Sequence, residues 1–378
     1  MRVDAVKHFP ASFLGDILDG LVAKNIFPRM VVGEFFDYNA GTLNDWVNQV
    51  NASMDPVTQQ NLDVRIFDFA LRPSLKDACD VFGYDARNIF NSSMVDQVGT
   101  SPFSVVTFAD NHDFDNEGNL IQNDPILANA YLLTNNQIGI PSIFYPEFFS
   151  DDSSKLRALM TAHKRYIFGA DNRDYLNRFN TPYSANYISG GASSSLIFQL
   201  SNQSFLDNEV IVVINFSGDV LQVDHEINMT HLNQGDTLTD IFSVSPNAFA
   251  VVSGSNQIYL EVPPRSFAVW IEGNKSNELI SLDPITTSIR DKIENPLQLE
   301  VYPQPVTGEL HIKVNESRSS RLILQLMDLN GRIVREAAHT VSVGAAEIQM
   351  DISSQPSGMY VLRVNLGDTY AVRRLMKQ

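Results

Sequence analysis

The sequence predicts a multidomain protein in which an α/β region comes first and two all-β modules follow. Three observations predict this fold class. Strand-like and helix-like segments alternate up to about residue 180, short strands and turn residues then take over, and a second all-β stretch follows a polar segment. The predicted domains are 1–180, 181–273 and 298–378, with a linker at 274–297.

In the first region, apolar runs typical of buried strands start about thirty to forty-five residues apart, the length of a βα unit. These runs are 1–6, 30–36, 64–71, 104–111 and 138–145. Segments with apolar residues three and four positions apart lie at 12–25, 42–53, 74–82, 124–136 and 153–170. The alternation predicts a parallel sheet covered by helices.

After about residue 180, short runs rich in β-branched and aromatic residues are separated by Asn, Gly, Ser and Pro. These runs are 193–201, 208–217, 221–229, 248–254, 257–264 and 266–273. They predict an antiparallel β-sandwich. In the last module, the Asn330-Gly331 pair within 322–336 predicts a hairpin turn.

The formal net charge is −17, from 27 basic and 44 acidic residues. Such a surface repels nucleic acid and anionic membranes, so neither is an expected partner, whereas a neutral sugar is not disfavoured. No run is long enough for a transmembrane helix, so we expect no membrane insertion. The one cysteine, Cys79, cannot form an intrachain disulfide, and its helical context favours a buried packing role.

Acidic residues follow three of the predicted strands. Asp4, Glu34 and Asp113 come at or just after the ends of the first, second and fourth runs. Catalytic groups in parallel βα sheets lie at the carboxyl ends of strands. A single acid there is more often a helix cap or a solvated loop residue, but three acids on three strands favour a site. A pair of carboxylates is the minimum that glycosidic bond cleavage needs.

The segments around these acids resemble a known family. "RVDAVKH" (2–8), "VVGEFFD" (31–37) and "FADNHD" (108–113) look like three signature segments of the α-amylase family, glycoside hydrolase family 13, in the family's order. "GIPSIFYPEFF" (139–149) looks like its eighth barrel strand, and "PPRSFAVWIE" (263–272) like the closing strand of its C-terminal β-sandwich. The resemblance implies the C-terminal portion of a (β/α)8 TIM barrel, strands four to eight, followed by that sandwich.

The resemblance also implies catalytic roles. Asp4 would be the nucleophile that forms a covalent glycosyl intermediate, Glu34 the general acid and then the base, and Asp113 the residue that binds sugar hydroxyls and stabilises the transition state. Retention of anomeric configuration follows. Glu34 needs a raised pKa for this role, and we expect Phe35 and Phe36 either to supply an apolar environment for it or to be core residues.

Four further residues are implied as substrate-binding residues: Arg2, Lys7, His8 and His112. Arg2 shares a strand face with Asp4, and a nearby cation keeps a carboxylate ionised. His8 also matches a position whose backbone carbonyl binds a structural calcium ion in the family, so Ca²⁺ is the one expected cofactor. Asp68, in the predicted strand 64–71, matches no catalytic position and is interpreted as structural.

The family's nucleophile ends the fourth barrel strand, whereas Asp4 lies at the start of this chain. We therefore expect this polypeptide to be the C-terminal part of a longer enzyme and to have little or no amylase activity alone. An open half-barrel would expose sheet edges and apolar surface.

The last region resembles the C-terminal sorting domain of type IX secretion substrates in Gram-negative bacteria. The resemblance implies export across the outer membrane to a secreted or cell-surface location, with the type IX machinery as partner and a signal peptide in a preceding segment. An ordinary carbohydrate-binding sandwich is the alternative. The matching residues are Tyr302, Pro303, Pro305, 328–331, 356–360, Arg373, Arg374 and Lys377, with Gln304 where Asn is usual.

The leading hypothesis is an exported α-glucan hydrolase. A transglycosylase of the same family and a non-catalytic surface glucan-binding protein are the alternatives. The sequence leaves the exact glucan, endo or exo attack and the oligomeric state open.

Overall fold

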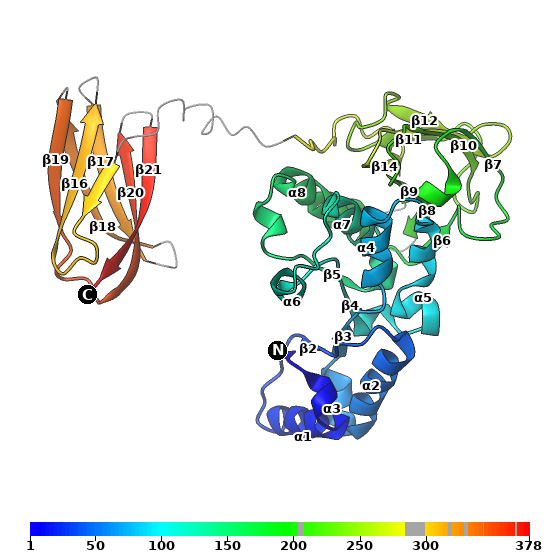
Figure 1. Ribbon diagram of the computed structural model, residues 1–378, viewed down its shortest axis with the longest axis horizontal. Helices are drawn as coiled ribbons and strands as arrows, with labels where there is room; N and C mark the ends of the chain where they lie inside the picture. The colour runs from blue at the N-terminus through cyan, green and yellow to red at the C-terminus, as the bar shows by residue number, and fades with distance from the viewer. Residues whose placement is uncertain (203–207, 284–298, 317–319, 329–331, 343, 367–368) are drawn as a thin grey trace. The chain divides into compact units, whose positions relative to one another are not determined.

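Five short parallel strands form the central sheet of the computed structural model (Figure 1). They are hydrogen-bonded in chain order, and each lies within one of the five predicted apolar runs. The sequence pattern therefore placed every strand of this sheet. The strands are β1 (Arg2–Val3), β2 (Val31–Gly33), β3 (Val64–Phe67), β4 (Val105–Phe108) and β5 (Ile140–Ser142).

The structure describes residues 1–202, 208–283, 299–316, 320–328, 332–342, 344–366 and 369–378. The chain divides into two compact units, Met1–Pro284 and Ile285–Gln378. The predicted turn at Asn330-Gly331 and most of the predicted linker lie outside the described residues.

Helices connect the parallel strands, as the sequence predicts. In α2, the Asn39 side chain caps the helix by accepting a hydrogen bond from Thr42 N at 3.0 Å. The longer helices are α1 (Ala11–Val22), α2 (Ala40–Ser53), α4 (Arg72–Asp80), α7 (Pro125–Thr134) and α8 (Ser153–Ala162). The shorter ones are η1 (Val6–His8), α3 (Pro56–Asn61), η2 (Ala86–Asn91), α5 (Met94–Val98), η3 (Pro102–Ser104), α6 (His112–Asn116), η4 (Asn136–Ile138), η5 (Glu147–Phe149) and η6 (His163–Ile167).

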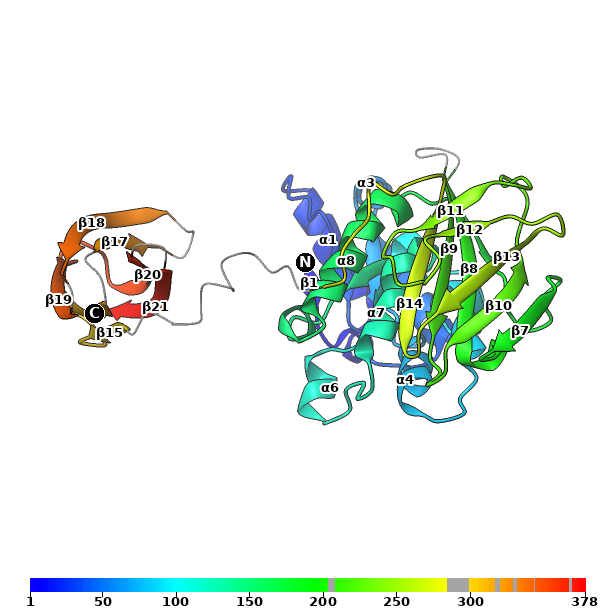
Figure 2. The same cartoon turned by 90° about the horizontal axis from the view of Figure 1, so that it is seen from above.

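An antiparallel β-sandwich packs on the helical layer of the same unit (Figure 2). Its sheets have the orders β12-β11-β14-β9-β8-β6 and β13-β10-β7. The first strand of the sandwich, β6 (Asn172–Tyr175), lies within the range 1–180 predicted for the first domain, so the sandwich begins before residue 181. The elements are β6 (Asn172–Tyr175), β7 (Ala185–Ser189), η7 (Ala192–Ser194), β8 (Ser195–Asn202), β9 (Asn208–Asn215), β10 (Leu221–Glu226), β11 (Thr237–Asp240), β12 (Phe249–Val251), β13 (Gln257–Val262) and β14 (Ser266–Glu272).

Helix α7 joins the two layers, because it contacts β4 on one side and β9 and β14 on the other. Residues 126–134 are all buried, which explains why this segment is apolar almost all round. Polar contacts reinforce the junction. Asp96 forms an ion pair with Arg173 at 2.5 Å and accepts a hydrogen bond from the Tyr175 hydroxyl at 3.0 Å.

The second unit is an antiparallel two-sheet structure with the strand orders β15-β16-β19 and β18-β17-β20-β21. Its strands are β15 (Leu299–Tyr302), β16 (Glu309–Glu316), β17 (Ser320–Met327), β18 (Ile333–Val341), β19 (Gly344–Asp351), β20 (Gly358–Leu366) and β21 (Thr369–Lys377). Alternate residues such as Leu322, Leu324 and Leu326 are buried between the sheets.

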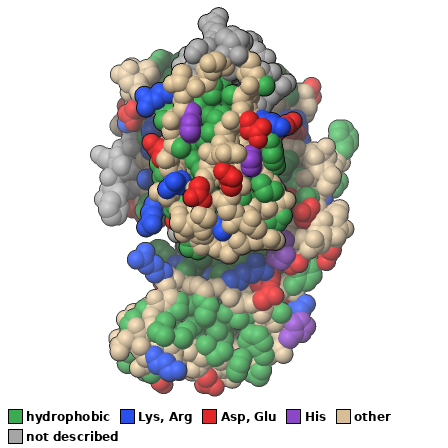
Figure 3. Space-filling view, turned by 90° about the vertical axis from the view of Figure 1, so that its left-hand side faces the viewer, with side chains coloured by type: hydrophobic (Ala, Val, Ile, Leu, Met, Phe, Trp, Pro, Cys, Tyr) green, Lys and Arg blue, Asp and Glu red, His purple; other side chains and the backbone are tan. Residues whose placement is uncertain are grey.

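The parallel sheet is open. Among the described strands, β1 and β5 each have a hydrogen-bonded neighbour on one side only. Large apolar residues are exposed on α1 and on the segment after it: Phe13, Ile17, Ile26, Phe27 and Met30. Figure 3 shows hydrophobic side chains gathered in the lower part of the view, where this end of the unit lies. An exposed edge and apolar surface of this kind are what an open half-barrel is expected to have.

The packing of Trp46 against β2, the strand that leads to Glu34, can be tested by substitution of Gly33. A Cβ atom at Gly33 would lie 2.8 Å from Cζ3 of the buried Trp46 ring. We expect Gly33→Ala to lower the free energy of unfolding by about 1–3 kcal/mol, since overpacking forces the ring or the strand to move. Urea unfolding followed by tryptophan fluorescence measures this, because both tryptophans, Trp46 and Trp270, lie in the first unit.

Gly20→Ala is the matched control. Gly20 lies in α1, and nothing lies within 4 Å of an added Cβ. This change should stabilise the helix by up to about 1 kcal/mol. Equal stability of Gly33→Ala and the unchanged chain would contradict the packing argument.

Candidate active site

The register between β1 and β2 brings two acidic residues together. Arg2 pairs with Val32 and Val3 with Gly33, so Asp4 and Glu34 each follow directly after the last paired residue. Glu34 N donates to Val3 O at 2.9 Å, and Val6 N donates to Glu34 O at 3.0 Å. Ala5 is in the left-handed region (φ 51°), which turns the chain into η1 immediately after Asp4. The backbone therefore fixes both carboxylates at the same rim of the sheet.

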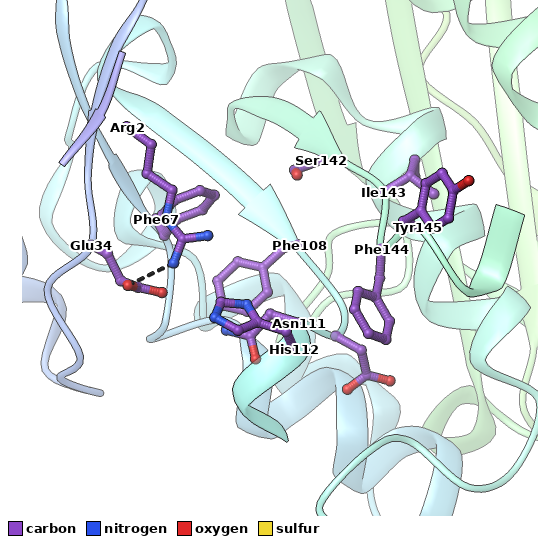
Figure 4. A pocket seen from close by; sticks show the side chains of 11 residues that line it. Arg2, Glu34, Phe67, Phe108, Asn111, His112, Ser142, Ile143, Phe144 and Tyr145 are labelled. Carbon is purple, nitrogen blue, oxygen red and sulfur yellow. Dashed lines mark ion pairs between the residues drawn. The ribbon is translucent and has the colours of Figure 1, made fainter. Parts of the chain in front are cut away.

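One guanidinium contacts both carboxylates. Arg2 Nη2 lies 2.7 Å from Glu34 Oε2 and 3.4 Å from Asp4 Oδ1. Figure 4 shows the Arg2 side chain reaching across to Glu34. The two acids differ in exposure, since the Asp4 side chain is 77% exposed and the Glu34 side chain only 10%.

The environment shifts the two pKa values in opposite directions. A side-chain hydrogen bond with Glu34, and then the charge of Arg2, lower the pKa of Asp4. Burial raises the pKa of Glu34, the hydrogen bond with Asp4 raises it further, and Arg2 opposes the rise. As the pH falls, Glu34 therefore takes up a proton before Asp4 does.

A cavity of about 140 Å³ lies beside Glu34 and Arg2 (Figure 4), and Asp4 is not among its lining residues. Both charged or polar groups and apolar rings line it. A sugar ring also has polar hydroxyls and apolar C–H faces, so a cavity of this composition can hold one. Its lining residues are Arg2, Glu34, Phe67, Phe108, Asp110, Asn111, His112, Ser142, Ile143, Phe144 and Tyr145.

Helix α6 presents His112 and Asp113. Asn111 caps this helix, since its Oδ1 accepts a hydrogen bond from Phe114 N at 3.0 Å. His112 lines the cavity, and its charged form would lower the pKa of Asp4. Asp113 lies next to His112, with Oδ1 3.4 Å from Nε2, rather than among the lining residues. The structure therefore brings Arg2, Glu34 and His112 to one cavity. Asp4, which contacts Arg2, and Asp113, which contacts His112, lie next to these residues and outside the lining.

Lys7 and His8 lie in η1, outside the set of lining residues. Lys7 Nζ donates to Phe36 O at 3.3 Å and lies 5.4 Å from the centre of the Phe36 ring. His8 is exposed. Within the described residues no group of three or more His, Cys, Asp or Glu side chains could hold a metal ion. The side chains around His8 thus supply no such ligand set, and calcium stays a prediction from the resemblance.

Phe35, beside Glu34 in the sequence, is half-buried and packs against the core of the parallel sheet. Phe36 is 40% exposed and packs on Phe69, with ring centres 5.1 Å apart. The aromatic rings that share the cavity with Glu34 are those of Phe67, Phe108, Phe144 and Tyr145, and neither Phe35 nor Phe36 is among them.

Asp68 is structural, as the sequence predicts. It is fully buried and accepts hydrogen bonds from Leu71 N and Met94 N at 3.1 and 3.0 Å. Burial raises the pKa of Asp68 to about 7. These contacts hold the start of α5 against the end of β3.

Sequence reasoning missed the lining residues from β3, β4 and the segment after β5. Phe67 and Phe108 are the last residues of their strands, and 142–145 lie at and just after the end of β5, within the predicted eighth barrel strand. Position at a carboxyl end of a strand was the signal that could have found them.

Residues 300–378 match the family described as secretion system C-terminal sorting domain. This match confirms the predicted sorting domain, and it supports a secreted or cell-surface protein. In the described part of the chain, none of the helices has the length and apolar character needed to cross a membrane.

The chain has homologues among α-amylase family enzymes, which confirms the resemblance. It is 33% identical over 194 residues to glucan 1,4-alpha-maltohexaosidase of Bacillus sp. (strain 707), covering 47% of this chain and 34% of that protein. It is 32% identical over 190 residues to alpha-amylase of Geobacillus stearothermophilus, covering 47% and 32%. It is 24% identical over 295 residues to cyclomaltodextrin glucanotransferase of Bacillus sp. (strain 17-1), covering 71% and 37%. The chain spans about a third of the length of these relatives.

The fold is similar to that of a solved glucanotransferase. The crystal structure of gamma-CGTase from alkalophilic Bacillus clarkii superimposes with a TM-score of 0.50 at 14% identity. The match covers 100% of this chain and 67% of that one. At this identity it speaks for the fold alone.

Replacing Arg2 tests the electrostatics of the pair. Because Arg2 lowers the pKa of both Asp4 and Glu34, we expect Arg2→Gln to raise both pKa values. Carboxyl ¹³C NMR titration of the labelled chain measures them, with Asp4→Asn and Glu34→Gln to assign the two signals.

The control is Arg87→Gln, which removes a guanidinium from another ion pair, with Asp85 at 2.6 Å. It should leave both titrations where they are. Unchanged or lower pKa values in Arg2→Gln would contradict the assignment of Arg2.

Proposed function

We propose that this chain carries the working carboxylates of a retaining α-glucan hydrolase of the α-amylase type, which cleaves α-1,4-glucosidic bonds of starch-like polysaccharides. The observation that carries the proposal is the pair Asp4 and Glu34, held by one guanidinium with pKa values shifted in opposite directions. Two carboxyl groups whose pKa values are shifted in opposite directions meet the requirements of a nucleophile and a general acid. The α-amylase homologues support the same chemistry.

In the first step, ionised Asp4 attacks the anomeric carbon of a glucosyl unit while the bond to the leaving oxygen breaks. Glu34 gives its proton to that oxygen, and a covalent glycosyl ester forms on Asp4. In the second step, ionised Glu34 takes a proton from water, whose oxygen attacks the anomeric carbon and frees Asp4. Two inversions give net retention.

The neighbouring groups fit supporting roles. Arg2 favours the ionised form of Asp4, which the attack requires. We assign His112 to hydrogen bonds with sugar hydroxyls, since it lines the cavity, and Asp113 to the same hydroxyls and to the developing positive charge. Phe67 and Phe108 would face the apolar C–H surface of the ring.

We further propose low turnover by the chain in isolation. Asp4 is 77% exposed, and among the described strands β1 has no partner on its outer side. A nucleophile in water lacks the preorganised, low-dielectric surroundings that make electrostatic stabilisation effective.

Transglycosylation is the second candidate, favoured by the cyclomaltodextrin glucanotransferase relative whose match covers 71% of this chain. It uses the same glycosyl ester and differs in whether a sugar or water accepts the glycosyl group. Product analysis on maltohexaose separates the two, since only transfer forms chains longer than the substrate. A non-catalytic surface glucan-binding role is a third candidate, favoured by the exposure of Asp4 and the open sheet edges.

We expect Asp4→Asn and Glu34→Gln each to reduce release of sugar from maltohexaose by roughly 10²–10⁴-fold. Azide should restore the rate of Glu34→Gln on an activated aryl α-glucoside, because azide replaces the attacking water and that leaving group needs no acid. With Asp4→Asn no ester forms, so any glucosyl azide should have the inverted (β) configuration, whereas Glu34→Gln should give the retained (α) product.

Glu117→Gln is the control, because Glu117 is an exposed acid just after α6. It should keep the parental rate. Measurable parental turnover that Asp4→Asn leaves unchanged would refute the hydrolase proposal. Binding of maltohexaose without turnover by any of these chains, the parent included, would favour the glucan-binding role.

We also propose that the second unit directs export through the type IX machinery. In a bacterium that has this system, deletion of 300–378 from the chain, supplied with a signal peptide, should leave it in the periplasm. The complete chain should reach the medium or the cell surface. Immunoblots of cell fractions measure this, and export of the shortened chain would contradict the role.

A further inference from the structure

A buried arginine, Arg72, lies under the segment that carries His112 and Asp113. Arg72 is the first residue of α4 and is 2% exposed. Its Nη2 lies 2.9 Å from Oδ1 of Asp110, which is itself only 4% exposed. A buried guanidinium and carboxylate are costly to desolvate, so the pair persists only where its geometry is well satisfied.

The remaining donors of Arg72 reach both ends of that segment. The chain leaves β4 at Ala109, whose carbonyl accepts a hydrogen bond from Arg72 Nε at 3.3 Å. It returns at Asn119, whose carbonyl accepts from Arg72 Nη2. The second oxygen of Asp110 accepts from Ile121 N at 3.0 Å. The Arg72–Asp110 pair thus connects the chain before α6, at 109–110, to the chain after α6, at 119–121.

Arg72 also contacts the apolar base of α6. Its Cζ lies 4.0 Å from the centre of the Phe114 ring, and Phe114 is fully buried. That ring packs against Phe36, Phe69 and Phe108. The planar fork of an arginine can donate in its plane and stack on an aromatic face together, which a lysine cannot do.

His112 and Asp113 themselves are weakly constrained. Their side chains are 55% and 48% exposed and face each other at 3.4 Å. Because neighbouring side chains cover so little of them, their direction depends on the backbone of α6. The contacts of Arg72 hold the two ends of the segment that carries this backbone, and the Asn111 cap holds the start of the helix.

We propose that Arg72 is a positioning residue that sets His112 and Asp113 at the rim of the cavity through its pair with Asp110. The functional part of this inference rests on the proposed glucan site. The positional part is independent of it, and the two are measured separately.

The test compares Arg72→Met, which keeps the length of the stem, with Arg87→Met. Arg87 is a matched control, because it pairs with Asp85 at 2.6 Å and stacks on Phe179 at 4.4 Å away from the cavity. The positional readout is the imidazole ¹H–¹³C signal of His112 at fixed pH, assigned with His112→Gln among the seven histidines. The functional readout is the Kd for maltohexaose by calorimetry.

We expect Arg72→Met to shift or broaden the His112 signal and to weaken maltohexaose binding at least tenfold. Arg72→Lys should recover only part of either effect. Arg87→Met should change neither, even if it lowers thermal stability as much. A folded Arg72→Met with the parental His112 signal overturns the proposal, and so does a His112 signal that moves equally in Arg87→Met.

Asp110→Asn keeps the test decisive where Arg72→Met does not fold. Its amide can still accept from Arg72 but loses the second acceptor for Ile121 N, so the returning chain is released. The same shift of the His112 signal is expected, and an unshifted signal overturns the proposal. A parental chain that binds no maltohexaose while the His112 signal responds as expected defeats the proposed function and leaves the positional role standing.

Discussion

The parallel register between β1 and β2 is the constraint on which the site depends. It pairs Val3 with Gly33, so the next residue of each strand, Asp4 or Glu34, emerges at the same rim. A shift of one residue would turn Glu34 toward the opposite face of the sheet. Gly33 permits the close approach of Trp46 beneath this strand, which couples the register to the packing of α2.

Electrostatics then shift the pKa values of two carboxyl groups, those of Asp4 and Glu34, in opposite directions. Asp4 and Glu34 contact the same guanidinium, yet the Asp4 side chain is exposed to water whereas the Glu34 side chain is mostly buried. Burial penalises the charged form of Glu34, and the hydrogen bond between the carboxyls stabilises the charge on Asp4. A nucleophile and a general acid need pKa values shifted in these two directions. The surroundings of Asp4 and Glu34 produce the shifts, although both residues carry the same carboxyl group.

Much of this was predictable because it is local or periodic. The five apolar runs predicted the five strands, and the rule for carboxyl ends predicted that Asp4 and Glu34 meet. Long-range packing was not predictable. Arg72 and Asp110 are 38 positions apart, and no local pattern links them. The sequence left open whether Phe35 and Phe36 surround Glu34 or pack in the core. Phe67 and Phe108 from other strands share its cavity, since lining depends on how strands lie side by side.

The most direct test of the central claim is trapping of the ester on Asp4. The chain with Glu34→Gln would be incubated with a fluorinated α-glucosyl fluoride, whose leaving group needs no acid and whose ring fluorine slows hydrolysis, and then digested for mass spectrometry. The account predicts a glucosyl adduct on the peptide that contains Asp4 and none when Asp4→Asn is added. An adduct on Asp113 or another carboxylate, or no adduct at all, would contradict it.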